Sequence, residues 1–178
     1  MNLMVYIGEK NPSGKIVKVD QLKPISGYYD YRTAGFEVRQ NKYTPINDFH
    51  TTPEIGTGRS GIDEYWNSTK KSPEYLLGGK YEKLTGYVAA DDLLKWTSYP
   101  EGYILLNVYT NNPITGGFDL VYTSPEIQFM KEPIQIEVPL VGVDRMYFEL
   151  YNPASYLTQW TLPSASHFFN IELKEISK

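Results

Sequence analysis

Apolar and polar residues alternate along the second half of the chain, and this period of two predicts β-strands. In each run one set of side chains is expected on a core face and the other toward solvent. The apolar sets are Ile104, Leu106 and Val108; Ile134, Ile136 and Val138; Met146, Phe148 and Leu150; and Phe169, Ile171 and Leu173.

Turn-forming residues separate these runs. They include Asn111-Asn112-Pro113, Gly116-Gly117, Ser124-Pro125, Val141-Gly142 and Asn152-Pro153. Gly, Pro and Asn are favoured where a chain reverses its direction. The segments between the turns leave no room for a long amphipathic helix, so the pattern indicates an antiparallel sandwich or barrel. The predicted fold class is all-β.

The first half of the chain is less regular. Residues 5–7 and 16–22 are predicted strands, and the second is expected at a sheet edge. Residues 41–72 are rich in Thr, Pro, Gly, Asn and Ser, which predicts a long loop region of the kind that often carries function. A short helical turn is expected near residues 91–96. We expect residues 1–178 to form a single domain, since no repeat or boundary interrupts them.

Composition excludes several classes of function. The net charge is −4 and basic residues form no long run, so nucleic acid is not an expected partner. The chain has no cysteine, which excludes disulfides, thiolate catalysis and cysteine-ligated zinc. Aromatic residues make up 15% of the chain and 16 of them are tyrosines. Tyrosine packs its ring while its hydroxyl stays hydrated, which suits half-exposed sheet faces and binding surfaces, although β-proteins are rich in aromatics in any case.

No membrane or export signal is apparent. No apolar run approaches the ~20 residues that a spanning helix needs, so membrane insertion is not expected. Residues 1–7 lack the basic and apolar regions of a signal peptide. If the protein is exported, we expect the sequence to be one module of a longer chain.

Residues 75–92 carry the clearest family signal. Tyr75-Leu76-Leu77-Gly78-Gly79-Lys80-Tyr81 reads as a strand entering a Gly-Gly turn, and Val88-Ala89-Ala90-Asp91-Asp92 as a strand that ends on two carboxylates. This pattern resembles the NPCBM family of carbohydrate-binding modules. The strands and turns that follow keep the family order, and the resemblance covers residues 72–176.

The resemblance implies a β-sandwich of the galactose-binding-like jelly-roll type, with ligand loops at one end. It also implies binding without catalysis, a glycan ligand such as a galactose-type sugar, and a place in a secreted or cell-surface bacterial protein. Two family motifs are altered here. Residues 55–60 have no histidine, and residues 164–169 have His167 but no tryptophan. Both lie where the family contacts its ligand and ions.

Sugar binding needs a flat aromatic face for the C–H side of the ring and planar polar groups for the hydroxyls. The alternative for each tryptophan is that it plugs the end of the core. Trp66 is the best candidate for exposure, because its neighbours are polar. The expected ligand-binding residues are Arg59, Asp63, Glu64, Tyr65, Trp66, Trp96, Tyr156 and Trp160.

Asp91 and Asp92 are the candidate metal ligands. Calcium takes six to eight oxygen ligands, and galactose-binding-like folds often hold a structural calcium ion. The alternative is that one of the two carboxylates caps a turn.

An enzyme is not expected. The two histidines, His50 and His167, show no metal-ligand spacing, and no nucleophile or phosphate-loop motif is present. We expect His167 to pack at a strand start. The alternative to sugar binding is a protein-interaction or assembly module that kept the fold and lost the sugar site. Tyrosines at outward strand positions would suit such an interface, and would equally suit a second sheet layer or an ordinary solvent face: Tyr87, Tyr109, Tyr147 and Tyr151.

Overall fold

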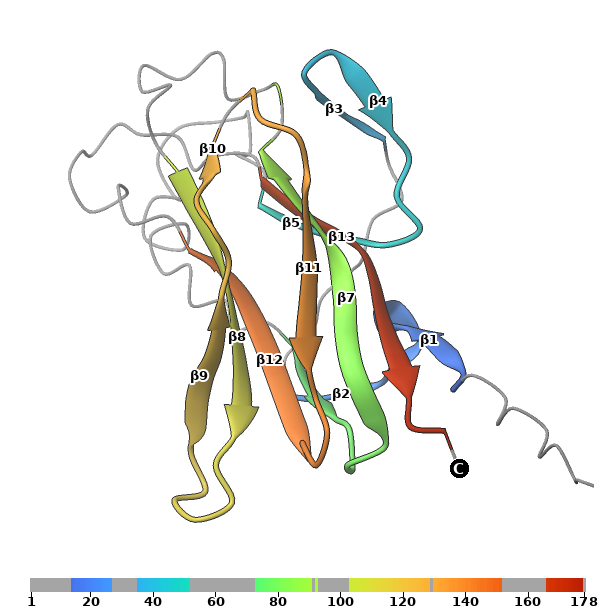
Figure 1. Ribbon diagram of the computed structural model, residues 1–178, viewed down its shortest axis with the longest axis vertical. Helices are drawn as coiled ribbons and strands as arrows, with labels where there is room; N and C mark the ends of the chain where they lie inside the picture. Colours follow the sequence, from blue (N-terminus) through green and yellow to red (C-terminus); the bar gives the residue numbers. More distant parts are fainter. Residues whose placement is uncertain are drawn as a thin grey trace, which may run out of the picture.

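Two antiparallel β-sheets pack face to face, and a short hairpin lies against the outer side of one of them (Figure 1). The computed structural model describes residues 14–26, 35–51, 73–90, 92, 103–128, 130–151 and 166–177. Every strand pair among them is antiparallel. The predicted antiparallel β-sandwich is therefore confirmed.

The five-stranded sheet has its longest strands, β7 and β13, at its centre. The strand order is β1-β13-β7-β11, and β5 also pairs with β13. Strand β1 lies at the edge and gives way to a 3₁₀ turn, η1 (Val19–Gln21), so the strand predicted at 16–22 is shorter than expected. The strands are β1 (Ile16–Lys18), β5 (Asp48–Thr51), β7 (Tyr81–Ala90), β11 (Ile134–Pro139) and β13 (Ser166–Glu175).

The six-stranded sheet forms the second layer. The strand order is β10-β8-β12-β6-β2, and β9 pairs with β8. The separate hairpin consists of β3 (Phe36–Val38) and β4 (Asn41–Tyr43). The strands of the sheet are β2 (Pro24–Ser26), β6 (Glu74–Leu76), β8 (Tyr103–Asn111), β9 (Phe118–Thr123), β10 (Ile127–Gln128) and β12 (Arg145–Tyr151).

The alternation read from the sequence defines the core between the sheets. At its centre Phe148 from one sheet meets Phe49 and Phe168 from the other edge-to-face, with ring centroids 5.0 and 5.1 Å apart. A buried side chain of this size contributes about 2–3 kcal/mol through the area it removes from water. The predicted core residues that are buried include Leu106, Val108, Ile136, Val138, Met146, Phe148 and Leu150.

A β-bulge in β13 overturns one predicted face. Asn170 has a left-handed backbone (φ 51°), and the pairing of β13 with β7 shifts between Phe169 and Glu172. Phe168 and Ile171 therefore share the core face, and Phe169 points to the opposite side, so the shared face predicted for Phe169 and Ile171 is wrong. The buried Asn47 amide stabilises the bulge, because it accepts the Ile171 N–H (2.7 Å) and donates to the Ile171 carbonyl (3.0 Å).

The family-like stretch at 75–92 connects the two layers. Its first strand, β6, belongs to the six-stranded sheet, and its second, β7, to the five-stranded sheet. Gly78 and Gly79 make the turn with left-handed backbones (φ 59° and 65°), which glycine adopts without a steric penalty. Their N–H groups donate to the carbonyls of Asp144 and Val143, so the turn is fixed to the one between β11 and β12.

The loop predicted at 41–72 is wrong for its first part, because residues 41–43 and 48–51 form strands β4 and β5. Residues 52–72, the strand predicted at 5–7 and most of the predicted turn at 91–96 lie outside the described residues. Within the part of the chain that is described, no helix has the length and apolar character that a membrane crossing requires.

Candidate functional site

Two segments that carry predicted ligand-binding residues, 91–102 and 152–165, begin and end at one end of the sandwich, which we call the loop end. The third, 52–72, begins there and ends at β6, which pairs with the start of β12. Strands β5, β7 and β12 finish there, and β8 and β13 begin there (Figure 1). Thr51 and Ala90 are both strand partners of Ser166, and Tyr151 is the partner of Leu105 in the other sheet. The predicted ligand-binding residues follow or precede these strand ends in the sequence and lie outside the described residues: Arg59, Asp63, Glu64, Tyr65, Trp66, Trp96, Tyr156 and Trp160.

Asp92 joins the end of β7 to the β3–β4 hairpin. Its carboxylate is buried, and its two oxygens accept the backbone N–H groups of Arg39 (2.8 Å) and Gln40 (2.7 Å). Both residues of this turn have left-handed backbones (φ 52° and 63°), as a type I′ hairpin turn requires. Asp92 therefore has the turn-binding role that was the alternative to metal binding.

Calcium binding at Asp91 and Asp92 stays a prediction. Asp91 lies outside the described residues. The described residues contain no group of three or more His, Cys, Asp or Glu side chains that could hold a metal ion.

A buried histidine–aspartate pair joins β13 to β5 beside the loop end. Nδ1 of His167 lies 2.8 Å from Oδ2 of Asp48, and both side chains are almost fully buried. The ring of Phe36 stacks on the imidazole with 3.8 Å between centroids and 4° between planes. His167 thus packs at a strand start, as predicted. Because the pair is closed to solvent, it suits holding the strands from which the loops leave rather than contacting a ligand.

A second candidate surface lies on the outer side of the six-stranded sheet. Tyr109 and Tyr147 are direct strand partners whose rings stack at 4.6 Å and 10°. Phe118 meets Tyr147 edge-to-face at 4.9 Å. The predicted outward orientation is confirmed for these two tyrosines, because their neighbours Val108 and Phe148 fill the core. Tyr87 is also exposed, and the Tyr151 side chain lies outside the described residues.

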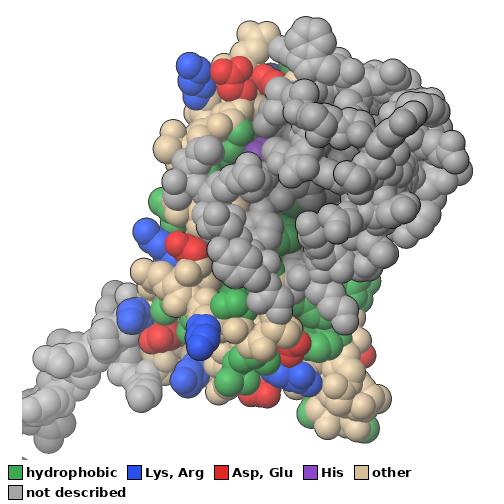
Figure 2. Space-filling model, turned by 180° about the vertical axis from the view of Figure 1, so that it is seen from behind, with side chains coloured by type: hydrophobic (Ala, Val, Ile, Leu, Met, Phe, Trp, Pro, Cys, Tyr) green, Lys and Arg blue, Asp and Glu red, His purple; other side chains and the backbone are tan. Residues whose placement is uncertain are grey.

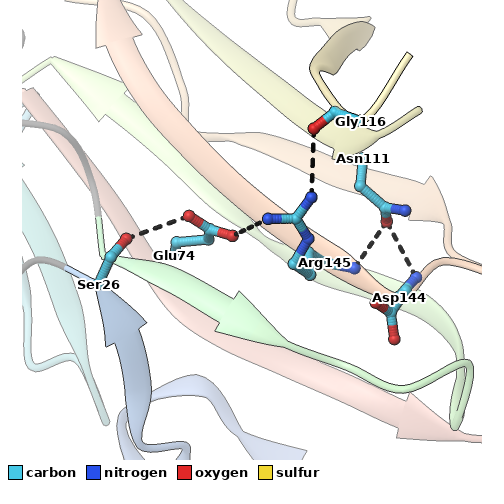
Figure 3. A network of polar contacts seen from close by, with 6 residues as sticks. All are labelled: Ser26, Glu74, Asn111, Gly116, Asp144 and Arg145. Atoms are coloured by element: carbon cyan, nitrogen blue, oxygen red, sulfur yellow. Dashed lines mark hydrogen bonds and ion pairs between the residues drawn. The ribbon is translucent and has the colours of Figure 1, made fainter. Parts of the chain in front are cut away.

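Arg145 is the centre of a polar network on this surface (Figure 3). Its guanidinium donates to Glu74 (3.0 Å) and to the Gly116 carbonyl (3.4 Å), and lies 5.1 Å from the centroid of the Phe118 ring. Glu74 also accepts the Ser26 hydroxyl (3.1 Å). These contacts hold the guanidinium of Arg145 beside Glu74 and over the Phe118 ring.

Glu149 occupies the other side of the tyrosine pair. Its Oε1 accepts the Tyr109 hydroxyl (2.6 Å) and the Asn107 amide (3.2 Å). Burial raises the pKa of Tyr109 strongly, and the hydrogen bond to Glu149 raises it further. Burial also raises the pKa of Tyr147, with a smaller contribution from the charges of Glu149 and Glu74. The Tyr109 phenol is therefore held neutral, as a donor to the Glu149 carboxylate.

We call Tyr109, Phe118, Arg145, Tyr147 and Glu149 the outer tyrosine face. The sequence prediction named the tyrosines but missed Arg145 and Glu149. The signal was present, because residues 145, 147 and 149 fall on one face of a predicted strand by their period of two. Seen from behind, hydrophobic side chains lie among acidic and basic ones over the lower part of the molecule (Figure 2).

Comparisons with known proteins identify the fold. Neither a protein-family model nor a curated protein matches this sequence. A solved CBM51 module of a GH95 enzyme from Clostridium perfringens, in complex with methyl-galactose, is similar at 14% identity and a TM-score of 0.56, over 90% of this chain and 100% of that chain. A CBM51-2 structure from Clostridium perfringens ZmpB, in complex with GlcNAc, is similar at 9% identity and a TM-score of 0.57.

Coverage differs between these neighbours. The match to the GlcNAc complex spans 91% of this chain and 32% of that one, which also contains INT domains. A longer ZmpB structure with a catalytic domain matches at 11% identity and a TM-score of 0.57, and this chain spans 15% of it. At these identities the likeness shows a shared β-sandwich fold.

Proposed function

We propose that this chain is a non-catalytic carbohydrate-binding module that binds a glycan at the loop end. We further propose that it belongs to the NPCBM family, takes a galactose-type sugar, and works in a secreted or cell-surface bacterial protein. The shared fold supports the class of function, since solved modules of this fold carry methyl-galactose and GlcNAc.

The observation that carries the proposal is the meeting of strand ends at the loop end. Thr51, Ala90 and Ser166 are neighbours across three strands, although 39 and 76 residues separate them in sequence (90 − 51 and 166 − 90). The predicted tryptophans Trp66 and Trp160 belong to segments that leave from this one place. A sugar needs aromatic and planar polar groups from several loops at once, and this topology brings at least one attachment point of each of these loops together.

The supports beneath the loop end fit a preformed binding site. The Asp48–His167 pair joins β5 and β13, which adjoin predicted ligand loops, and Asp92, just after β7, binds the β3–β4 hairpin. A site whose framework is fixed before binding loses less conformational entropy when the ligand arrives. These buried polar groups therefore have a role in a binding module that needs no catalysis.

A glycan array with the purified chain tests this proposal. We expect galactose-containing glycans among the bound structures, and an affinity at least about ten-fold lower after Trp66→Ala or Trp160→Ala, the size of effect expected when a central aromatic contact is lost. Tyr87→Ala serves as the aromatic control away from the loop end. An array without binding, or binding that neither tryptophan variant weakens, would contradict the proposal.

Calcium at Asp91 and Asp92 is part of the same proposal and has a separate test. An ion that binds only the folded chain must raise its thermal stability. We expect the unfolding temperature to rise with added calcium and to fall with a chelator, and Asp91→Asn to remove the response. An unchanged unfolding temperature in both conditions would rule out the ion.

A further inference from the structure

The outer tyrosine face holds charged groups with unused hydrogen-bonding capacity. Both hydrogen bonds of Glu149 end on Oε1, and Oε2 accepts none from the described residues. Two of the five N–H donors of the Arg145 guanidinium form hydrogen bonds, one to Glu74 and one to Gly116, and the Arg145 side chain is 31% exposed. A cation and an anion thus flank Tyr147 on the same strand, each two residues away.

The aromatic geometry favours a protein partner over a sugar at this face. A sugar ring packs on an open aromatic face, but the Tyr109 and Tyr147 rings stack on each other and Phe118 meets Tyr147 edge-to-face. Two exposed leucines border the cluster, Leu76 (55% exposed) and Leu120 (52%). Tyr and Arg at the centre with aliphatic side chains around them are typical of protein interfaces.

We propose that the outer tyrosine face binds the same face of a second copy of this chain, an inference that goes beyond the glycan-binding function. Arg145 and Glu149 lie symmetrically about Tyr147 on β12, and Glu74 of β6, in register with Tyr147, is paired with Arg145 within the chain. The proposed two-fold axis lies between the two faces, passes over Tyr147 and runs perpendicular to β12. It brings Arg145 opposite the partner's Glu149. The same axis brings Glu149 opposite the partner's Arg145, so two ion pairs form and Tyr147 meets its own copy.

The size of the face sets the strength of the dimer. Five neighbouring strands at about 4.8 Å spacing span about 20 Å across the sheet, and the 7 residues of β12 span about 24 Å along it. The contact area is therefore about 500 Å², which is below the roughly 800 Å² per partner of a stable interface. We therefore expect a weak, reversible dimer that forms at protein concentrations of about 10–500 µM. Because this axis sets the two β12 strands antiparallel, the two loop ends lie at opposite ends of the dimer, so one dimer would join glycans on two separate partners.

Charge reversal with sedimentation analysis tests the proposed pairing. We expect Arg145→Glu alone and Glu149→Arg alone to abolish the dimer, because each juxtaposes like charges twice. The double variant Arg145→Glu/Glu149→Arg restores both pairs with exchanged signs and should dimerise again. An equal mixture of the two single variants should form a heterodimer, since each supplies the charges that the other needs.

The charge variants need a control and a check of folding. Glu137→Arg makes the same charge change on the five-stranded sheet and should leave the dimer intact. Arg145→Glu also breaks the Glu74 pair, so thermal unfolding must show that each variant is folded at the temperature of measurement. The double variant loses the same Glu74 pair, which separates loss of stability from loss of the interface.

A cross-link provides a test that removes no charge. The chain has no cysteine, so Tyr147→Cys introduces a single thiol on the proposed axis. Face-packed sheets are about 10 Å apart, which is beyond the roughly 7 Å between Cα atoms that a disulfide spans, so a short bis-maleimide cross-linker is used. It should link Tyr147→Cys into a dimer at least about ten-fold faster than Val141→Cys, a turn position that is 73% exposed and lies off the face.

The proposal is overturned if the wild-type chain is monomeric over the whole concentration range, or if the two thiol variants cross-link at equal rates. It is also overturned if Glu149→Arg weakens glycan binding in a monomeric protein, because the face would then be a sugar site. Dimerisation that is restored in the double variant and in the mixture supports it.

Discussion

The outer faces of the two sheets differ in what covers them. On the five-stranded sheet, Phe36 and Val38 of the β3–β4 hairpin pack on Ala89 and Phe169 and form a second small core. On the six-stranded sheet, the corresponding positions carry half-buried tyrosines with charged neighbours, Arg145 and Glu149 among them. The chain closes one face with its own apolar residues and keeps aromatic and charged groups on the other.

This difference teaches how an aromatic residue on an outer face should be interpreted. Phe169 lies on an outer face and is buried with stabilising contacts, whereas Tyr147 lies on an outer face and has polar and charged neighbours. Outward orientation alone therefore does not mark a binding surface. The mixture of ring, cation and carboxylate around Tyr147 is the feature that distinguishes it.

The largest expected effect separates the two faces directly. Phe169→Ala removes a ring that contacts Phe36, Tyr43 and Tyr87, and should lower the free energy of unfolding by about 3–4 kcal/mol. Tyr147→Ala removes a half-buried ring and should cost about 1 kcal/mol. Urea denaturation of both variants at low protein concentration provides the comparison. Equal losses would mean that both outer faces are structural.

The next effect concerns the hairpin that covers the five-stranded sheet. Asp92→Ala leaves the backbone N–H groups of Arg39 and Gln40 without their acceptor and should lower the free energy of unfolding by about 2 kcal/mol. Amide hydrogen exchange should accelerate first in β3 and β4. Asp144→Ala, an exposed carboxylate at the other end of the sandwich, is the matched control and should change stability by less than about 0.5 kcal/mol. A hairpin that remains protected in Asp92→Ala would contradict the assigned role.

The smallest effect is a dependence on pH at the outer tyrosine face. The pKa of Tyr109 in the folded chain lies above the value of about 10 for an unfolded phenol, so the folded state favours the neutral ring. Its contribution to stability is complete below about pH 10 and is lost as the pH rises above that value. Denaturation curves should show stability falling above pH 10, and Tyr109→Phe should make this fall shallower. A variant with the same fall as the wild-type chain would show that Tyr109 does not contribute to it.

Much of the sandwich was predictable because its strands are long and regular. The period of two in the runs ending at Val108, Val138 and Leu150 identifies buried faces without knowledge of the partner strands. The same local rule failed at β13, where the left-handed Asn170 shifts the alternation. The local sequence does not predict that bulge, because the amide that stabilises it belongs to Asn47, which is 124 residues from Ile171 in the sequence.

The candidate site was predictable to a smaller degree. Asp48 and His167 are 119 residues apart in sequence, and Asp48 fell in a segment whose Pro and Thr content predicted a loop. Tertiary contacts with β13 overrode that local preference and made β5 a strand. Arg145 and Glu149 were within reach of the sequence, because they share a strand face with Tyr147. Their partners Glu74 and Tyr109 come from other strands and required the fold.

The most direct test of the account is a calorimetric titration of methyl-galactose into variants of the two regions. The account assigns sugar binding to the loop end and self-association to the outer tyrosine face, so the two sets of variants should separate. We predict that Trp66→Ala and Trp160→Ala weaken sugar binding by at least about ten-fold, and that Arg145→Glu leaves it unchanged. Sugar binding that is lost in Arg145→Glu and kept in both tryptophan variants would contradict the account.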